Sequence, residues 1–183
     1  MSRLRKEVIQ RRWVNISTDR ADFVVDRERV NMAFSPFSKG NKGRKPGEVY
    51  AIWEGDRAAN TPGWQVRVVP NKFPVLGIEG DTETARDGVF EEIDGVGVHE
   101  AVVDTPRSEP DLADLHPDQV GRVFRACRER LRDLVNDRRL RYLLVFKNHG
   151  LEDGAPVSRS HTQIIGLPVT PITVRQELTS TRQ

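Results

Sequence analysis

Hydrophobic and polar positions alternate in short stretches along the 183-residue chain, which is typical of β-strands with one buried face. The clearest case is 64–69, where Trp64, Val66 and Val68 alternate with Gln65 and Arg67. Further short strands are predicted at 13–16, 23–25, 48–53, 98–103, 142–146 and 161–166, of which 142–146 is an uninterrupted apolar run. The segment 77–92 is acidic and contains several glycines, so we expect a surface loop there.

The longest periodic segment predicts a helix over 117–137. Pro117 suits the first helical position. Apolar side chains then recur at helical spacing, at Val120, Val123, Phe124, Cys127, Leu131, Leu134 and Val135. Because Cys127 lies on this stripe, we expect it to pack in the core and not to act as a reactive thiol. Thr170 and Pro171 can begin a second, short helix.

Several strands with one long helix between them predict an α+β fold, in which helices pack on a mainly antiparallel sheet. The length fits a single domain covering residues 1–183.

Composition and charge narrow the function classes. The chain has 29 Lys and Arg against 27 Asp and Glu, and the two signs interleave, so we expect no broad basic surface for nucleic acid. A single cysteine excludes a disulfide scaffold and a cysteine-rich zinc site. No apolar run approaches the roughly 20 residues of a membrane span, and none follows the first residues as in a signal peptide. We therefore expect a cytoplasmic protein without a membrane partner.

The richest candidate for chemistry lies between Phe146 and Ile165. A glycine-containing loop at 148–160 leads into a predicted strand that carries His161 and Gln163. Residues two apart in a strand face the same side, so these side chains should converge. An imidazole can attack phosphorus, and a glutamine amide can donate to a phosphoryl oxygen. The alternative is that His161 is a hydrogen-bonded histidine in a half-buried strand.

Six sequence blocks give this segment a context. They are Arg-Trp-Val at 12–14 followed by Arg20, Ser-Pro-Phe-Ser-Lys-Gly-Asn at 35–41, Trp-Gln-Val-Arg-Val-Val-Pro-Asn-Lys-Phe-Pro at 64–74, Gly-Val-His-Glu at 97–100 followed by Thr-Pro-Arg-Ser at 105–108, Phe-Lys-Asn-His-Gly at 146–150, and Arg-Ser-His-Thr-Gln at 159–163. In content and order they resemble the N-terminal half of the galactose-1-phosphate uridylyltransferase family, within the histidine-triad superfamily. The resemblance implies a histidine-triad-like antiparallel sheet with one long helix and short flanking helices.

The resemblance also implies roles for individual residues. His161 would attack the α-phosphorus of a nucleoside diphosphate sugar and form a covalent nucleotidyl-histidine, from which a hexose 1-phosphate takes the nucleotide. Gln163 would bind the phosphoryl oxygens. Substrate would also contact Arg20, Asn71, Phe73, Asn148, Gly154 and Arg159. Such proteins pair their sheets, so a homodimer is expected.

The chain departs from the family where the family binds zinc. Its four ligand positions are occupied here by Ser35, Ser38, Ser108 and Arg159. A serine hydroxyl is a poor zinc ligand and a guanidinium does not coordinate, so we expect no metal cofactor. One hypothesis is that the three serines hydrogen-bond around Arg159, which replaces the cation. The alternative is that all four are solvated polar side chains.

The expected function is nucleotidyl transfer from a nucleoside diphosphate sugar. Hydrolysis or phosphorolysis on the same fold is one alternative, and a degenerate nucleotide-binding module that works with a partner chain is another. Family members continue into a second, similar half that supplies part of the sugar-phosphate pocket, so galactose specificity is not carried over. Of the other histidines, His99 is expected to be structural, and His116 to cap the long helix or lie on the surface. His149 is expected to lie on the surface, with a role as a second acid or base as the alternative.

Overall fold

The computed structural model describes residues 2–17, 47–55, 59–107, 111–149 and 160–181. The strand expected at 23–25 lies outside this part of the chain.

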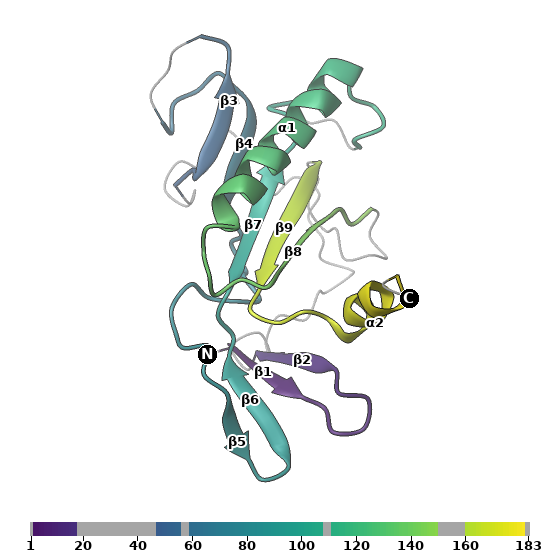
Figure 1. Cartoon of the computed structure of the whole chain (residues 1–183). Coiled ribbons are helices and arrows are strands. Elements are labelled where there is room, and N and C mark those ends of the chain that lie inside the picture. The colour runs from purple at the N-terminus through teal and green to yellow at the C-terminus, as the bar shows by residue number, and fades with distance from the viewer. Residues whose placement is uncertain (1, 18–46, 56–58, 108–110, 150–159, 182–183) are drawn as a thin grey trace, which may run out of the picture.

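The described residues form two antiparallel sheets and two helices (Figure 1). The larger sheet has the strand order β3-β4-β7-β9-β8, with β3 at Tyr50–Trp53, β4 at Trp64–Pro70, β7 at Val98–Val103, β9 at His161–Leu167 and β8 at Tyr142–Phe146. The smaller sheet has the order β2-β1-β6-β5, with β2 at Trp13–Ser17, β1 at Ser2–Lys6, β6 at Phe90–Asp94 and β5 at Ala85–Asp87. The α+β prediction is confirmed, and the strands expected at 98–103 and 142–146 have the predicted bounds.

The expectation of a loop throughout 77–92 is wrong, because part of this segment forms β5 and β6. Its acidic residues are cross-strand partners of basic residues in β1. Lys6 Nζ lies 2.6 Å from Glu91 Oε2, and Arg5 pairs with Glu92. The acidic side chains that indicated a solvated loop therefore neutralise basic side chains of β1, which is more than 80 residues away in sequence.

The helix α1, at Pro117–Leu134, packs against β3, β4 and β7 on one face of the larger sheet. Its N-terminus is capped by His116, whose Nδ1 accepts a hydrogen bond from the backbone N–H of Asp118 at 3.3 Å. The cap expected at His116 is thus present. The shared core consists of Val66, Val68, Val102, Val123, Ala126, Cys127, Leu134 and Ile164.

The predicted apolar stripe of this helix is partly wrong. Phe124 and Val135 are 64% and 65% exposed, whereas Arg130 is buried. Arg130 donates two hydrogen bonds to the Glu100 carboxylate, at 2.7 and 2.9 Å, and these bonds raise the pKa of Arg130 above its ordinary value. An ion pair with β7 thus occupies part of the helix face that simple periodicity assigns to apolar contacts.

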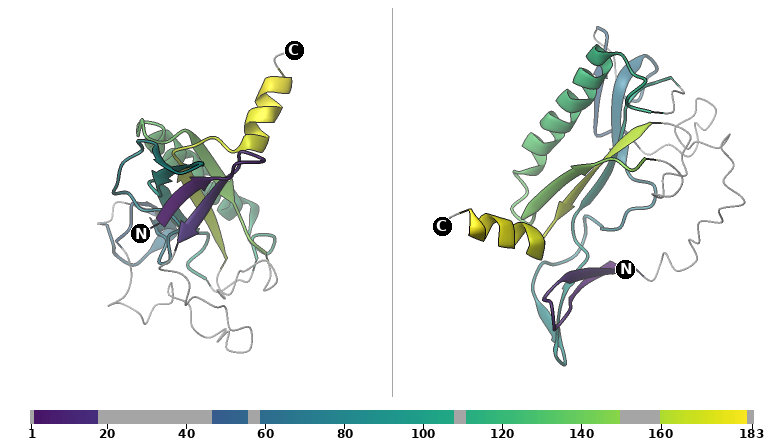
Figure 2. Two further views of the ribbon diagram at one scale, coloured as in Figure 1. Left: turned by 90° about the horizontal axis from the view of Figure 1, so that it is seen from below. Right: turned by 90° about the vertical axis from the view of Figure 1, so that its right-hand side faces the viewer.

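The second helix, α2 at Ile172–Ser180, begins after Pro171 as expected and projects from the larger sheet in both views of Figure 2. On the other face of β9, Ile165 and Leu167 pack against a cluster of Leu4, Leu76 and Ile93. The two sheets therefore share a second apolar core. Neither described helix is long and apolar enough to cross a membrane.

Candidate active site

His161 and Gln163 lie on the face of β9 that is opposite to α1. The residues between and after them, Thr162 and Ile164, are buried on the α1 side, and Ile164 belongs to the core beneath that helix. Since strand residues alternate, His161 and Gln163 occupy the other face. The structure therefore places this pair together as the sequence spacing predicts.

The carboxamide of Gln163 is held by two neighbours. Its Oε1 lies 2.8 Å from His99 Nε2 and 3.4 Å from Asn71 Nδ2. His99 Nδ1 accepts the backbone N–H of Val75 at 3.2 Å, so in the neutral ring the proton is on Nε2, which donates to Gln163. The amino group of Asn71 also lies 3.0 Å from Nε2, and with the proton there it can donate to Gln163 Oε1 but not to His99. Asn71 is itself fixed, because its Oδ1 accepts the backbone N–H of Phe73 at 2.9 Å. With two donors on its oxygen, Gln163 keeps its amide nitrogen as the donating end.

Strand pairing explains why these side chains meet. In β7, Ala101 pairs with Gln163 and His99 pairs with Ile165, so His99 is a diagonal neighbour of Gln163 on the same face. Asn71 follows directly after β4, and its backbone N–H donates to the carbonyl of His99 at 2.8 Å. The sequence analysis gave His99 only a structural role. Strand alternation over 98–103 places His99 on the same face as Ala101, but the register that brings this face beside Gln163 is not encoded in the local sequence.

The backbone around His161 is anchored by a buried polar cluster on the α1 side. The carboxylate of Asp104, which is fully buried, accepts hydrogen bonds from Ser160 Oγ at 2.8 Å and Thr162 Oγ1 at 2.9 Å. Lys147 Nζ lies 2.9 Å from the same carboxylate and donates to the His161 carbonyl at 3.0 Å. Both residues that flank His161 are thus held from behind, which fixes the strand from which the imidazole projects. Sequence reasoning missed this cluster.

Asn148 comes two residues after Phe146, the partner of Gln163 in the β8–β9 pairing. It therefore lies at the end of the sheet where His161 begins β9. Phe73, which follows Asn71 in the loop after β4, is 44% exposed. The structure thus brings Asn71, Phe73 and Asn148 to the region of His161 and Gln163.

The remaining predicted site residues are outside the described part of the chain: Arg20, Gly154 and Arg159, and with them the replaced zinc positions Ser35, Ser38 and Ser108. Within the described ranges, no group of three or more His, Cys, Asp and Glu side chains is arranged to hold a metal ion.

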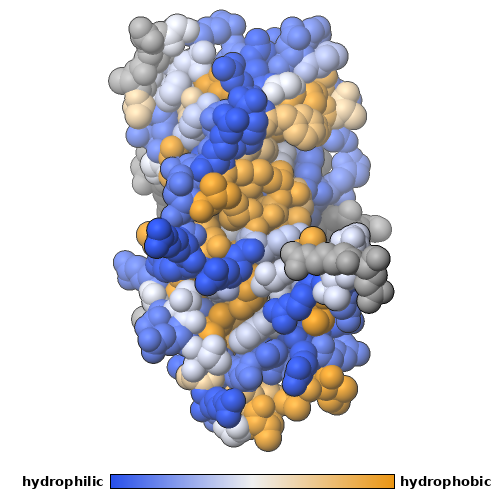
Figure 3. Space-filling model, in the orientation of Figure 1, coloured by the Kyte–Doolittle hydropathy of each residue, from blue (hydrophilic) through white to orange (hydrophobic). Residues whose placement is uncertain are grey.

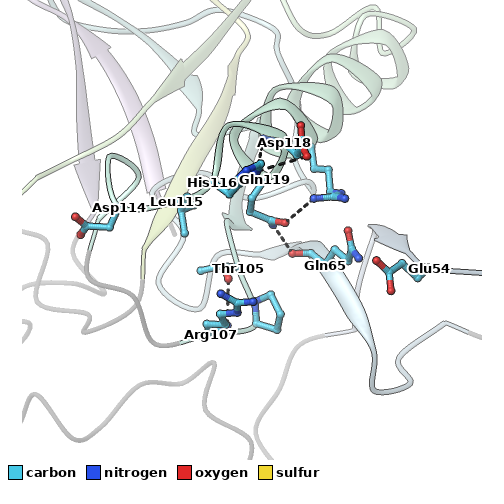
Figure 4. Close-up of a pocket in the computed structure, with 11 residues that line it drawn as sticks. Glu54, Gln65, Thr105, Arg107, Asp114, Leu115, His116, Asp118 and Gln119 are labelled. Atoms are coloured by element: carbon cyan, nitrogen blue, oxygen red, sulfur yellow. Dashed lines mark hydrogen bonds and ion pairs between the residues drawn. The ribbon is translucent and has the colours of Figure 1, made fainter.

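A separate cavity of about 340 Å³ lies on the helix side of the sheet, at the N-terminus of α1. Figure 4 shows Gln119 from α1 pointing into it beside Gln65, with Thr105 and Arg107 on the facing side. Gln119 Nε2 donates to the carbonyls of Gln65 and Asp104, at 2.8 and 2.6 Å. Among the predicted substrate-binding residues that the structure describes, none lines this cavity.

The other candidate side chains lie away from the His161–Gln163 face. Cys127 is buried in the core, as expected, and burial raises the pKa of its thiol from 9.0 to about 11. Its thiolate is therefore scarce at neutral pH, which argues against a nucleophilic role. His149 is exposed, and its Nδ1 lies 3.0 Å from Asp111 Oδ2.

The long helix packs on one face of the antiparallel sheet and the His161–Gln163 pair lies on the opposite face, which fits the expected histidine-triad-like fold. No family model matches the chain. However, the chain is 30% identical to an ADP-glucose phosphorylase of Arabidopsis thaliana, over 98% of this chain and 52% of that protein.

Solved structures agree with this relationship. A uridylyltransferase structure superposes with a TM-score of 0.74 and 28% identity, over all of this chain and 50% of the other. The structure of the Arabidopsis thaliana ADP-glucose phosphorylase with bound ADP-glucose gives a TM-score of 0.69 and 30% identity, over all of this chain and 54% of the other. The chain thus spans about half the length of the relatives it matches. Its resemblance to the N-terminal half of the galactose-1-phosphate uridylyltransferase family is confirmed.

Proposed function

We propose that this chain transfers a nucleotide from a nucleoside diphosphate sugar through a covalent nucleotidyl group on His161. The observation that carries this proposal is the placement of His161 and Gln163 on one sheet face, with the Gln163 oxygen held by His99 and Asn71. The relatives add support, because they are named as an ADP-glucose phosphorylase and a uridylyltransferase.

The first step forms one bond and breaks one. A lone pair on a ring nitrogen of neutral His161 attacks the α-phosphorus, and an N–P bond forms. The bond from that phosphorus to the bridging oxygen breaks, and the sugar 1-phosphate leaves with the electron pair. The ring keeps its proton on the other nitrogen and becomes a nucleotidyl-imidazolium. Because the sugar 1-phosphate departs as a stable anion, no acid is needed to release it.

In the second step an acceptor oxygen attacks the same phosphorus and the N–P bond breaks, which restores the neutral imidazole. A hexose 1-phosphate as acceptor gives a new nucleoside diphosphate sugar, inorganic phosphate gives a nucleoside diphosphate, and water gives a nucleoside monophosphate. We favour transfer to a phosphate oxygen. The phosphorylase relative makes inorganic phosphate a natural second acceptor to test.

The other residues have supporting roles in this proposal. The Gln163 amide N–H donates to a non-bridging phosphoryl oxygen, where charge accumulates in the transition state. Asn71 and the exposed ring of Phe73 contact the base and ribose, with Arg20 and Asn148 on the nucleotide. Gly154 contributes a backbone N–H, and Arg159 adds a fixed positive charge near the phosphates.

A product assay tests the reaction. The protein is incubated with UDP-glucose or ADP-glucose and with glucose 1-phosphate, inorganic phosphate or water as acceptor, and nucleotides are separated by chromatography. We expect turnover that depends on a phosphate acceptor and disappears in His161→Ala. His116→Asn is a matched control, because it removes an exposed histidine and keeps a capping side chain. Equal turnover by His161→Ala would refute the mechanism.

We further propose that the reaction needs no zinc, with Ser35, Ser38 and Ser108 hydrogen-bonded around Arg159. Elemental analysis of the purified protein should find far less than one zinc per chain, and dialysis against a chelator should leave turnover unchanged. Stoichiometric zinc, or activity lost to the chelator and restored by zinc alone, would contradict this proposal.

A binding module that acts with a second chain is the alternative function. The chain spans about half of its relatives, and a homodimer or a partner resembling their other half would supply the remaining surface. In the described sheet, β8 pairs only with β9, so its other edge is available to another strand. Figure 3 shows a hydrophobic area beside α1. Leu143 and Val145 of β8 are partly buried and pack against the core beneath α1.

We propose a homodimer of one-domain chains that acts in the cytoplasm, a compartment that suits a reduced cysteine. Light scattering after size exclusion gives the mass directly. A dimer at micromolar concentration supports the homodimer. A monomer that is inactive alone, and that copurifies with a second chain, favours the module.

A further inference from the structure

We propose that His99 is a positioning residue for catalysis: it fixes the orientation of the Gln163 amide so that the nitrogen faces the transferring phosphoryl group. This inference rests on the proposed function. It gives His99 a role in the chemical step, beyond its place in the β7 strand.

The contact is short and specific. His99 Nε2 lies 2.8 Å from Gln163 Oε1. Asn71 Nδ2, the second donor near this oxygen, lies 3.4 Å from it and 3.0 Å from His99 Nε2. The two residues belong to neighbouring strands and are diagonal neighbours in the β7–β9 register. His99 is therefore the stronger of the two donors that determine which way the amide points.

The tautomer of His99 is itself fixed, so that Nε2 acts as a donor to Gln163. Its Nδ1 accepts the backbone N–H of Val75 at 3.2 Å, which puts the proton of the neutral ring on Nε2. A proton on Nε2 can bond only to an acceptor, so it selects the oxygen of Gln163 and not its nitrogen. The backbone N–H of Val75, in the loop after β4, thus fixes the tautomer of His99. This tautomer in turn fixes the orientation of the Gln163 amide.

The orientation matters because the two ends of a carboxamide have opposite roles. The nitrogen donates and stabilises negative charge on a phosphoryl oxygen, whereas the oxygen would repel it. Without the donor at His99, only the longer bond from Asn71 opposes a flip of Gln163. The transition state would then meet the wrong end of the amide in a fraction of the molecules.

Two substitutions separate this role from a structural one. In His99→Asn, the side-chain oxygen can replace Nδ1 as the acceptor for Val75, but the side chain is too short to reach Gln163. In His99→Gln, the amide nitrogen reaches the place of Nε2 and can donate to Gln163. The first variant keeps the structural contact and loses the positioning contact, and the second restores the positioning contact.

The experiment follows single-turnover formation of the nucleotidyl-enzyme, with UDP-glucose and ADP-glucose as donors, by intact-protein mass spectrometry after rapid quenching. We expect His99→Asn to form the adduct roughly 10- to 100-fold more slowly, somewhat less than the loss typical for removing one such donor outright. His99→Gln should stay within about fivefold of the wild type, and the apparent donor affinity should change little in either variant. In Gln163→Ala, adding His99→Asn should cause no further loss, because the positioned group is already gone.

Several results would overturn the inference. One is an unchanged rate in His99→Asn. Another is a double variant, His99→Asn with Gln163→Ala, in which the two separate reductions of the rate of adduct formation multiply. A third is a uniform loss in His99→Asn and His99→Gln that follows their thermal stability.

A second measurement does not depend on activity. Nitrogen NMR of the histidine rings should show His99 protonated at Nε2 and not at Nδ1, and the side-chain amide signals of Gln163 should shift in His99→Asn but not in His99→Gln. The opposite tautomer would overturn the inference even in an inactive protein. Absence of any adduct in the wild type, with the expected NMR result, would instead refute the proposed function and leave the His99 contact standing.

Discussion

The buried thiol of Cys127 should make the free energy of unfolding depend on pH in the alkaline range. Burial raises the pKa of this group from 9.0 to about 11 in the folded protein. Between these two values the unfolded chain releases a proton that the folded protein retains. The free energy of unfolding should therefore fall as pH rises from about 9 to 11, by up to roughly 1.4 kcal/mol per pH unit from this group.

Urea denaturation at a series of pH values between 8 and 11 measures this slope. In Cys127→Ala the overall stability is lower because a small cavity is left, but the slope should be less steep, since only the other titrating groups remain. An identical slope in both proteins would contradict the assignment.

At the same scale, the sequence identified His161 and Gln163 correctly as neighbours, because strand alternation alone puts residues two apart on one face. It could not identify the partners that hold them. His99 lies 64 residues before Gln163, and Asp104 lies 56 residues before Ser160. Only the strand register brings these groups into contact, and no local pattern encodes that register.

At the scale of elements, the Asp104–Lys147 pair joins the end of β7 to the segment after β8. Asp104 is fully buried, so removing its partner leaves an uncompensated charge. Lys147→Met should lower the free energy of unfolding by about 3–5 kcal/mol. Adding Asp104→Asn should recover part of that loss, since the buried charge is then gone.

The matched control is the Asp137–Arg139 pair at the surface, with a distance of 2.8 Å. Asp137→Asn should cost no more than about 1 kcal/mol, as is usual for exposed ion pairs. If chemical denaturation gives similar losses for Lys147→Met and Asp137→Asn, the buried cluster does not anchor β9.

The surroundings of Gly97 and Gly121 differ, so substitution by alanine should have opposite effects on stability at these two positions. A side chain at Gly97, just before β7, would collide with the backbone carbonyl of Gly166 in β9. Gly97→Ala should therefore destabilise the protein by about 1–3 kcal/mol. Gly121 in α1 has open space around it, so Gly121→Ala should stabilise by up to about 1 kcal/mol through helix propensity.

Thermal unfolding of the two alanine variants gives the comparison directly. The midpoint should fall for Gly97→Ala and rise for Gly121→Ala. Changes in the same direction would show that the close approach of β7 to β9 does not constrain Gly97.

Helices and strands were predicted correctly where the local hydrophobic pattern matched the burial of the residues. The prediction was wrong where tertiary contacts determined which segment formed a strand or which residue was buried. The strands β7 and β8 were predicted from short, largely apolar segments, and the start of α1 was predicted from helical periodicity and Pro117. The strands β5 and β6 carry the charges of a loop, and they form because β1 supplies Arg5 and Lys6 as partners. Likewise, Arg130 occupies the buried face of α1 because Glu100 meets it there.

At the scale of the whole molecule, the candidate site lies on one face of the larger sheet, and the loop after β4 contributes Asn71 to it. Gln163, His99 and Asn71 form one hydrogen-bonded network on the sheet face that also carries His161. The class of reaction followed from the sequence blocks and their order. The acceptor and the base did not, because in the proposed mechanism they depend on surfaces other than the sheet face that carries His161.

The central claim is a covalent nucleotide on His161, and intact-protein mass spectrometry tests it most directly. The protein is mixed briefly with UDP-, ADP-, GDP- or TDP-glucose in the absence of a phosphate acceptor and quenched at alkaline pH, because phosphoramidate bonds are labile in acid. Released nucleotide is measured in the same samples. The account predicts a mass increase of one nucleoside monophosphate that maps to His161 and is absent in His161→Ala. Neither adduct nor released nucleotide with any donor, or an adduct that persists in His161→Ala, would contradict it.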